Sequence, residues 1–177
     1  IKAGASGFIV PAHASEVEVL SEEEQDKLVE VAVKAVNSSD ARGTFGVFRG
    51  LYQTNLTDRV RAARKAVALG AQGIDIDVPY VNDAQYLKDV HDVITQIPES
   101  VMVMIQDNTG IPTATVVALA EREPQFVALK SKASADAMWR ASAVLNATGR
   151  GRLVVGANSD AKFQMVNSLV RGLSIFA

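Results

Sequence analysis

Apolar residues along the chain gather into short runs, which alternate with longer stretches of helical periodicity. The short runs cover residues 7–11, 44–48, 73–79, 101–105, 126–130, 153–156 and 173–176, and we expect each to form a strand. In the stretches between them, apolar residues recur three or four positions apart, as Tyr86, Val90 and Ile94 do. This period predicts helices. Near-continuous apolar strands separated by helices are typical of a parallel sheet covered by helices on its faces.

Local signals place the ends of several helices. Ser21 is followed three residues later by Glu24, and this pair predicts a capping box at the start of the first helix. Asn55 or Thr57 is expected to cap the second helix, and Gly70 is expected to end it. Further helices are predicted over residues 82–97, 113–121, 135–145 and 161–170.

About seven strands separated by six helices predict an α/β fold, a (β/α)8 TIM barrel. A complete barrel has eight strand–helix units and typically needs about 250 residues, whereas this chain has 177. We therefore expect one TIM-barrel domain over residues 1–177, without its first strand and its C-terminal helices. The alternative is an open, doubly wound sheet.

Composition narrows the classes of partner. The chain is 48% apolar and carries a net charge of −2, with Lys and Arg interspersed among Asp and Glu. This distribution argues against nucleic acid and against an anionic membrane surface as partners. The absence of cysteine excludes disulfides and zinc–thiolate sites and suits a reducing compartment, so we expect a cytoplasmic protein.

Lys130 stands at the end of the apolar run 126–130. In parallel β/α folds the carboxyl ends of the strands form the rim where ligands bind. A lysine drawn out of bulk water there loses its proton more readily and can attack a carbonyl to form a Schiff base. The alternative is a lysine whose stem lies along the strand end and whose amine reaches solvent.

Other polar residues follow the expected strands and should converge on the same rim. Arg49 could clamp a substrate carboxylate through its fork of donors, or could form an ion pair at the rim. His13 could act as a base or bond locally. The remaining rim residues that we expect near a small polar acid are Ala14, Ser15, Tyr80, Gln106 and Gly156.

Several motifs, in order along the chain, resemble the dihydrodipicolinate synthase / N-acetylneuraminate lyase family of class I, pyruvate-type aldolases. The resemblance covers nearly the whole chain. It implies a complete barrel with C-terminal helices, a Schiff-base lysine at Lys130, no metal or organic cofactor, and a homo-oligomer, either a tetramer or a dimer. The motifs are Lys2-Ala3-Gly4-Ala5-Ser6-Gly7-Phe8-Ile9-Val10, Leu20-Ser21-Glu22-Glu23-Glu24, Ala68-Leu69-Gly70-Ala71-Gln72-Gly73, Pro79-Tyr80 and Phe126-Val127-Ala128-Leu129-Lys130.

The resemblance also implies roles at the site. Lys130 would be the covalent residue, Tyr80 would assist proton transfer, and backbone donors around Ala14 and Ser15 would hold the carboxylate of the substrate. The chain departs from the family at two informative places. The family's "GTTGE" loop is replaced by Ala12-His13-Ala14-Ser15-Glu16, and its proton-relay tyrosine aligns with Gln106, which cannot do acid–base work.

We therefore predict a Schiff-base-forming lyase, an aldolase or dehydratase, that acts on pyruvate or another 2-oxo acid and takes an aldehyde as its second substrate. One alternative is a member of the same fold that binds a small acid without turnover. Another is a metal-dependent aldolase, in which a divalent ion polarises a carbonyl. Its ligands would come from carboxylates and one imidazole, namely Glu16, Asp75, Asp77, Asp107 and His13.

Overall fold

The computed structural model describes residues 7–12, 16–40, 42–43, 45–131, 154–158 and 174–176. The strands are β1 (Gly7–Ile9), β2 (Gly46–Leu51), β3 (Gly73–Ile76), β4 (Met102–Asp107), β5 (Phe126–Ser131), β6 (Val154–Asn158) and β7 (Ser174–Phe176). The helices are the short 3-10 helix η2 (Val17–Val19) and the α-helices α1 (Glu22–Asn37), α2 (Leu56–Ala68), α3 (Asp83–Ile94) and α4 (Thr113–Arg122).

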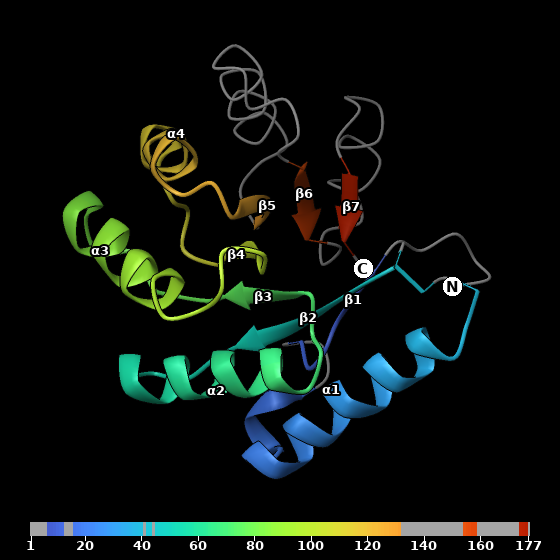
Figure 1. Ribbon diagram of the computed structural model, residues 1–177. Coiled ribbons are helices and arrows are strands. Elements are labelled where there is room, and N and C mark those ends of the chain that lie inside the picture. Colours follow the sequence, from blue (N-terminus) through green and yellow to red (C-terminus); the bar gives the residue numbers. More distant parts are fainter. Residues whose placement is uncertain are drawn as a thin grey trace.

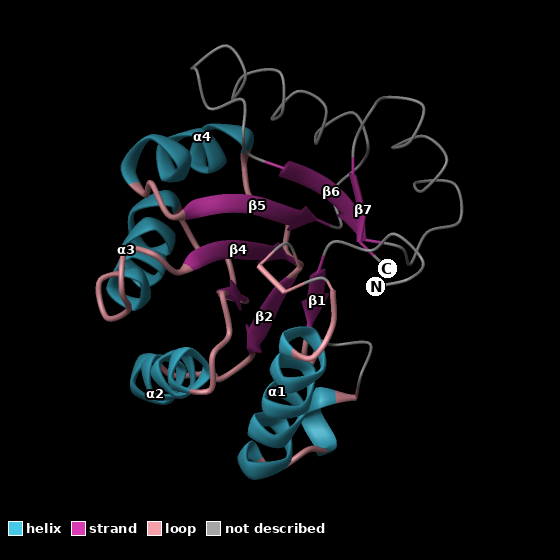
Figure 2. Ribbon diagram, turned by 45° about the vertical axis from the view of Figure 1, so that its right-hand side comes forward, coloured by secondary structure: helices cyan, strands magenta, loops and turns pink. Residues whose placement is uncertain are grey.

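The strands form one parallel sheet of seven, in the order β1-β2-β3-β4-β5-β6-β7. Each strand therefore pairs with its neighbours in the chain, whereas a doubly wound sheet reverses its strand order at a switch point. Figures 1 and 2 show that the sheet curls and that the α-helices lie on its outer side. The predicted barrel architecture is confirmed, and the alternative of an open, doubly wound sheet is wrong.

Alternation along the strands separates an outer from an inner face. Ile74 and Ile76 of β3 belong to the same buried cluster as Val90 and Val93 of α3, so this face of the strand packs against the helices. Asp75, which lies between the two isoleucines, must then point into the barrel. The same reasoning on β4, where Val103 and Ile105 pack outward, turns Met104 and Gln106 inward.

Side-chain caps fix the starts of α1 and α2. The Ser21 side chain accepts a hydrogen bond from the Glu24 N–H, and the Glu24 carboxylate accepts one from the Ser21 N–H, so the predicted capping box is confirmed. Asn55, rather than Thr57, caps α2 by accepting from the Asp58 N–H. Gly70, with φ of 94°, follows the end of α2 in the left-handed conformation that glycine adopts without strain.

Two strand boundaries differ from the prediction in a way that matters for the site. β2 was expected to end at residue 48 but continues to Leu51, which puts Arg49 inside the strand. β4 was expected to end at residue 105 but continues to Asp107, which puts Gln106 inside the strand. In both places a polar residue continues the strand. Arg49 has an ion-pair partner, Asp26, on α1, and Gln106 has a hydrogen-bond partner in Asn108. The local sequence reveals neither contact. The helices expected over 135–145 and 161–170 lie outside the described residues.

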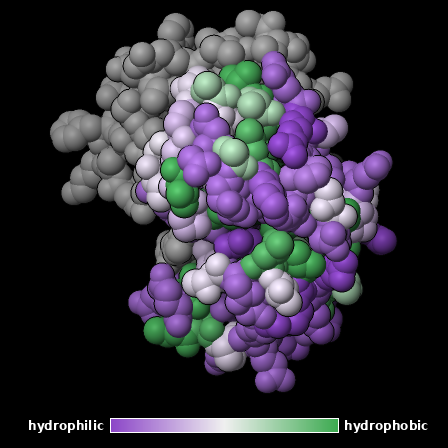
Figure 3. Space-filling model, turned by 90° about the vertical axis from the view of Figure 1, so that its left-hand side faces the viewer, coloured by the Kyte–Doolittle hydropathy of each residue, from purple (hydrophilic) through white to green (hydrophobic). Residues whose placement is uncertain are grey.

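The outer surface of the helices is mainly hydrophilic. Figure 3 shows one face of the molecule, on which apolar side chains form small separate areas among polar ones. Six large apolar side chains are exposed among the described residues, and only two of them, Leu28 and Val31, belong to the same helix. Within the same residues, no helix combines the length and apolar character needed to cross a membrane.

Candidate active site

Lys130 lies on the inner face of the barrel near the carboxyl end of β5. Its neighbour Leu129 packs outward in the main hydrophobic cluster, so the lysine on the next position of the strand turns inward. The side chain is 7% exposed. A lysine is rarely buried to this extent without a partner or a function. The strand-end position predicted from the sequence is confirmed, and its burial excludes a side chain that simply extends into solvent.

Gln106 and Gly156 flank Lys130 on the two neighbouring strands. The register pairs Gln106 of β4 with Lys130 and pairs Lys130 with Gly156 of β6. Paired residues of parallel strands lie about 4.8 Å apart and point to the same face. The structure therefore brings together three of the residues that were predicted to form the site.

A chain of hydrogen bonds leads from Asp77, which directly follows β3, to Gln106. Asn108 Nδ2 donates to Asp77 Oδ2 over 2.8 Å, and Gln106 Nε2 donates to Asn108 Oδ1 over 3.0 Å. Gln106 is 1% exposed, and its Oε1 has no hydrogen-bond partner among the described residues. Sequence analysis singled out Gln106 and Asp77 separately but did not link them, because the link depends on a residue two positions beyond Gln106.

Asp107 has a structural role in the loop after β4. Its Oδ1 accepts hydrogen bonds from the backbone N–H groups of Thr109, Gly110 and Ile111, at 3.2, 2.7 and 3.0 Å. Gly110 has φ of 83°, which lets the chain turn back on the carboxylate. Asp107 thus fixes the loop that carries Asn108, and this explains why a carboxylate follows directly after Gln106.

Asp75 and Tyr52 also lie near the barrel interior. Sequence analysis considered Asp75 only as a possible metal ligand and did not consider Tyr52. Asp75 is fully buried and pairs in register with Gly50, one step deeper in the barrel than Gln106. Tyr52 follows β2, and a Cβ atom on Gly50 would come within 2.5 Å of its ring, so the ring lies over Gly50. Alternation of Asp75 with isoleucines was the sequence signal for an inward carboxylate. Tyr52 offered no such signal.

Arg49 faces the helices and not the barrel interior. It shares a strand face with Val47 and Leu51, which pack in the two hydrophobic clusters. Its guanidinium donates to Asp26 over 2.5 Å and to Gln25 over 3.1 Å, both on α1, and the side chain is 1% exposed. This is the ion-pair alternative of the sequence analysis, with the pair formed between sheet and helix rather than at the rim.

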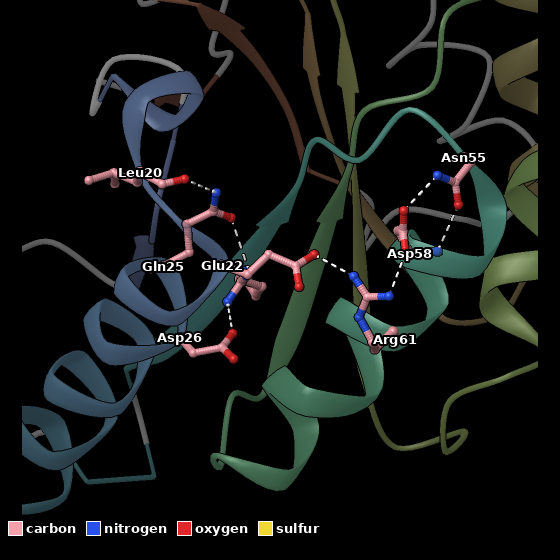
Figure 4. A network of polar contacts seen from close by, with 8 residues as sticks. Leu20, Glu22, Gln25, Asp26, Asn55, Asp58 and Arg61 are labelled. Carbon is pink, nitrogen blue, oxygen red and sulfur yellow. Dashed lines mark hydrogen bonds and ion pairs between the residues drawn. The ribbon is translucent and has the colours of Figure 1, made fainter.

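Figure 4 shows the surroundings of this pair. Gln25 also donates to the Leu20 carbonyl, and Glu22 of α1 pairs with Arg61 of α2 over 2.7 Å. Arg61 also contacts Asp58, which Asn55 holds in turn. A surface hollow is lined by Arg49, Asp26 and Arg61, and another lies beside α2 and Gln96; neither is lined by Lys130. The polar network therefore joins α1 to α2 and lies apart from the candidate site.

Tyr80 stands at the rim after β3, as predicted, but its hydroxyl is held by helix α3. It donates to Asp83 Oδ1 over 2.7 Å, and Asp83 also accepts from the hydroxyl of Thr115 on α4. The hydrogen bond to Asp83, more than burial, raises the pKa of the Tyr80 phenol, because that bond requires the neutral hydroxyl. The structure thus places Tyr80 on the rim but does not bring its hydroxyl to Lys130.

Three of the predicted site residues, His13, Ala14 and Ser15, lie outside the described residues. Within the described part of the chain, no group of three or more histidine and acidic side chains is close enough to hold a metal ion. The metal-dependent alternative requires such a group and included His13, so it stays a prediction.

The comparisons with known proteins agree on one family. The model of the dihydrodipicolinate synthetase family matches residues 1–164. The chain belongs to this family. A curated relative, the 4-hydroxy-tetrahydrodipicolinate synthase of Synechococcus sp. (strain CC9902), is 35% identical over 82 residues, which make up 46% of this chain and 26% of the relative.

Solved structures of the family share the fold. YagE, a prophage protein from E. coli K12 solved in complex with pyruvate, aligns over 98% of this chain with a TM-score of 0.81 and 21% identity. The 4-hydroxy-tetrahydrodipicolinate synthase of Methylacidiphilum fumariolicum SolV aligns over 98% with a TM-score of 0.82 and 17% identity. This chain covers 58% and 57% of those two chains, so it spans less than two thirds of their length.

Proposed function

We propose that this member of the dihydrodipicolinate synthetase family is a Schiff-base-forming lyase that acts on pyruvate or another 2-oxo acid through Lys130. The single observation that carries the proposal is the position of Lys130, buried on the inner face at the carboxyl end of β5 in a barrel of this family. The ligand-binding rim of such a barrel is the expected place for a covalent lysine.

The chemistry follows from a neutral lysine amine and a keto carbon. Lys130 Nζ forms a bond to C2 of the oxo acid, and the keto oxygen takes up a proton to give a carbinolamine. The carbinolamine hydroxyl takes up a proton from solvent and leaves as water, which gives an iminium. The positive nitrogen of the iminium accepts the electron pair released when a C3 proton leaves or a C3–C4 bond breaks. The resulting enamine can add to an aldehyde, so both synthesis and cleavage are open to the same site.

The remaining site residues support this proposal to different degrees. Gly156 pairs in register with Lys130 and would lie beside the substrate carbons. Backbone donors at Ala14 and Ser15 would hold the carboxylate, and His13 would assist proton transfer. Tyr80 would serve as a relay only if its hydroxyl left Asp83. We further propose that the protein works in the cytoplasm as a homo-oligomer, a dimer or a tetramer, without a metal or organic cofactor.

Borohydride trapping tests the proposal directly. The chain is incubated with pyruvate and borohydride, digested, and mapped by mass spectrometry. We expect a reduced pyruvyl adduct on Lys130 that is absent in Lys130→Ala and unchanged in Lys88→Ala, which removes an exposed lysine of α3. An absence of any adduct on Lys130 with pyruvate and with a panel of other 2-oxo acids would refute the proposal.

Gln106 favours a second candidate function, a binding protein without turnover. The family tyrosine that relays protons is a glutamine here, and an amide cannot transfer a proton at neutral pH. A binding protein should show saturable heat of binding with a 2-oxo acid in calorimetry but no borohydride adduct. Loss of binding on adding a chelator would instead indicate the metal-dependent alternative.

A further inference from the structure

The amide of Gln106 is bound to the loop after β4 by hydrogen bonds that fix its orientation. An ionised carboxylate accepts hydrogen bonds and has none to donate. Asn108 therefore presents its Nδ2 to Asp77 Oδ2, at 2.8 Å, and its Oδ1 is left to accept from Gln106 Nε2, at 3.0 Å. We call Asp77 and Asn108 the Gln106 clamp, because together they hold the amide nitrogen toward the rim of the barrel.

Asp77, the first residue of this clamp, is itself fixed by its main chain. Its N–H donates to the Leu51 carbonyl at the end of β2 over 3.3 Å, and its carbonyl accepts from Arg59 Nη2 of α2 over 3.4 Å. Arg59 is buried and also donates to the Gln53 carbonyl in the loop after β2. The clamp therefore starts from a point that β2 and α2 hold in place.

Without the clamp, Lys130 would be available to the Gln106 amide as a new partner. The two residues pair in register across β4 and β5, face the barrel interior and are both buried. Gln106 Oε1 accepts no hydrogen bond from any described residue, so none joins it to Lys130. A buried amide that loses one hydrogen bond gains free energy by making another. An amide oxygen can accept from a lysine nitrogen, so the clamp separates two neighbouring groups that could otherwise bond.

We propose that Asp77 and Asn108 are positioning residues for the lysine chemistry, because they hold the Gln106 amide off the nitrogen of Lys130. This rests on the proposed function and deepens it. A Lys130 nitrogen that is bound to Gln106 must break that bond before it can attack the keto carbon of an oxo acid. A nitrogen without this bond is ready for the attack. The clamp therefore raises the fraction of molecules that can react.

Three variants separate this role from general support of the loop. Asn108→Ala breaks the clamp and frees the Gln106 amide. Adding Gln106→Leu to Asn108→Ala removes the freed amide, so that it can no longer occupy Lys130. Thr109→Ala is the matched control, because it removes another bond of the same loop, from the Tyr80 N–H to Thr109 Oγ1 at 3.2 Å, and leaves the clamp intact. None of these substitutions changes the charge of the site.

The test measures how fast Lys130 reacts in each variant at one fixed pH. The first assay is borohydride trapping at low pyruvate concentration, and the second is acetylation by acetic anhydride, with mass mapping of Lys130 in both. We expect both rates to fall about fivefold in Asn108→Ala, as one amide–lysine hydrogen bond would cause. Both should return close to the parent rate in the double variant, and Thr109→Ala should match the parent. Circular dichroism checks that each variant is folded.

The outcomes separate the two proposals. Acetylation needs no oxo acid, so the absence of an adduct in the parent would refute the proposed function, while the acetylation rates would still decide the role of the clamp. An unchanged acetylation rate in folded Asn108→Ala would refute that role. A lower rate that Gln106→Leu fails to restore would also refute it, because removing the amide cannot repair a damaged loop. If Asn108→Ala or the double variant does not fold, Asn108→Ser or Gln106→Met takes the place of the substitution that failed.

Discussion

The hydroxyl of Tyr80 donates to Asp83 across 2.7 Å, and this bond ties the rim after β3 to the first turn of α3. Asp83 also accepts from Thr115, so one carboxylate joins the loop after β3, α3 and α4. Both contacts lower the pKa of Asp83, since they favour its ionised form, with Thr115 contributing most. The phenol that the family resemblance assigned to proton transfer is therefore occupied in a structural contact between the sheet and two helices.

Tyr80→Phe should leave the borohydride adduct on Lys130 in place and modestly lower stability. The phenol contributes to stability only while it is neutral. Because the pKa of Tyr80 is raised in the folded state, its contribution is present below about pH 10 and is lost as the pH rises through the folded value. The measurements are the trapping rate and the free energy of unfolding at pH 8. A strong loss of trapping in folded Tyr80→Phe would restore the relay role.

Arg49→Ala should destabilise the protein without affecting the lysine chemistry. The variant leaves Asp26 and the buried amide of Gln25 without their partner, which should cost about 3 kcal/mol of unfolding free energy. Arg61→Ala, which breaks an exposed pair in the same network, should cost much less. Urea unfolding of both variants measures this difference. Equal costs would contradict the expected weight of the buried Arg49 pair. A loss of pyruvate trapping in folded Arg49→Ala would contradict the expectation that Arg49 takes no part in the lysine chemistry.

The contrast between Arg49 and Lys130 shows what local sequence can and cannot predict. The periodicity of apolar residues was enough to predict the strand–helix alternation and the parallel sheet. The polar residues at the helix starts predicted the cap at Ser21 and narrowed the cap of α2 to Asn55 or Thr57. Both cations follow apolar runs, and both were read as strand ends. What separates them is which face each occupies and whether a partner lies 23 residues away on α1, as Asp26 does for Arg49. Such contacts depend on tertiary packing.

In the candidate site, too, the sequence predicts some features and not others. Lys130, Gln106 and Gly156 fall in one register row because the order and length of the strands bring them there, and both features leave a trace in the sequence. The orientation of the Gln106 amide leaves none, since it depends on Asn108 and on the carboxylate of Asp77, in the loop after β3. Polar residues that set geometry through one another are beyond the reach of pattern and spacing.

Ser21→Ala should weaken α1 in a pH-dependent manner. Loss of an N-cap serine typically costs about 1 kcal/mol. The pKa of Glu24 is lowered mainly by its hydrogen bond from the Ser21 backbone, so the ionised carboxylate is the form that stabilises the fold. That contribution is present above the unfolded pKa of about 4.5 and is lost as the pH falls through the lower folded pKa. Ser21→Ala keeps the backbone N–H but removes the hydrogen bond that the Ser21 hydroxyl donates to Glu24 Oε2, the second cause of the lowered pKa. The difference in unfolding free energy between Ser21→Ala and the parent should therefore shrink from pH 7 to pH 3, and a constant difference would contradict the capping box.

Gly73→Ala should be strongly destabilising because the ring of Phe48 occupies the space of the new methyl group. A Cβ on Gly73 would lie 2.3 Å from Phe48 Cε1 and 2.8 Å from the Met102 carbonyl oxygen. Overpacking of this kind typically costs about 1–3 kcal/mol. Phe48→Leu shortens the side chain but leaves the carbonyl contact, so it should rescue part of the loss and not all of it.

A double-mutant cycle on Gly73 and Phe48 measures this coupling through unfolding free energies. Neighbours in contact should give a non-additive term, because the cost of the methyl group depends on the ring that it meets. Pairing Phe48→Leu with Ser21→Ala supplies the control, since that serine caps α1 at the surface and should give additive effects. Additivity in both cycles would show that Phe48 does not fill the space over Gly73.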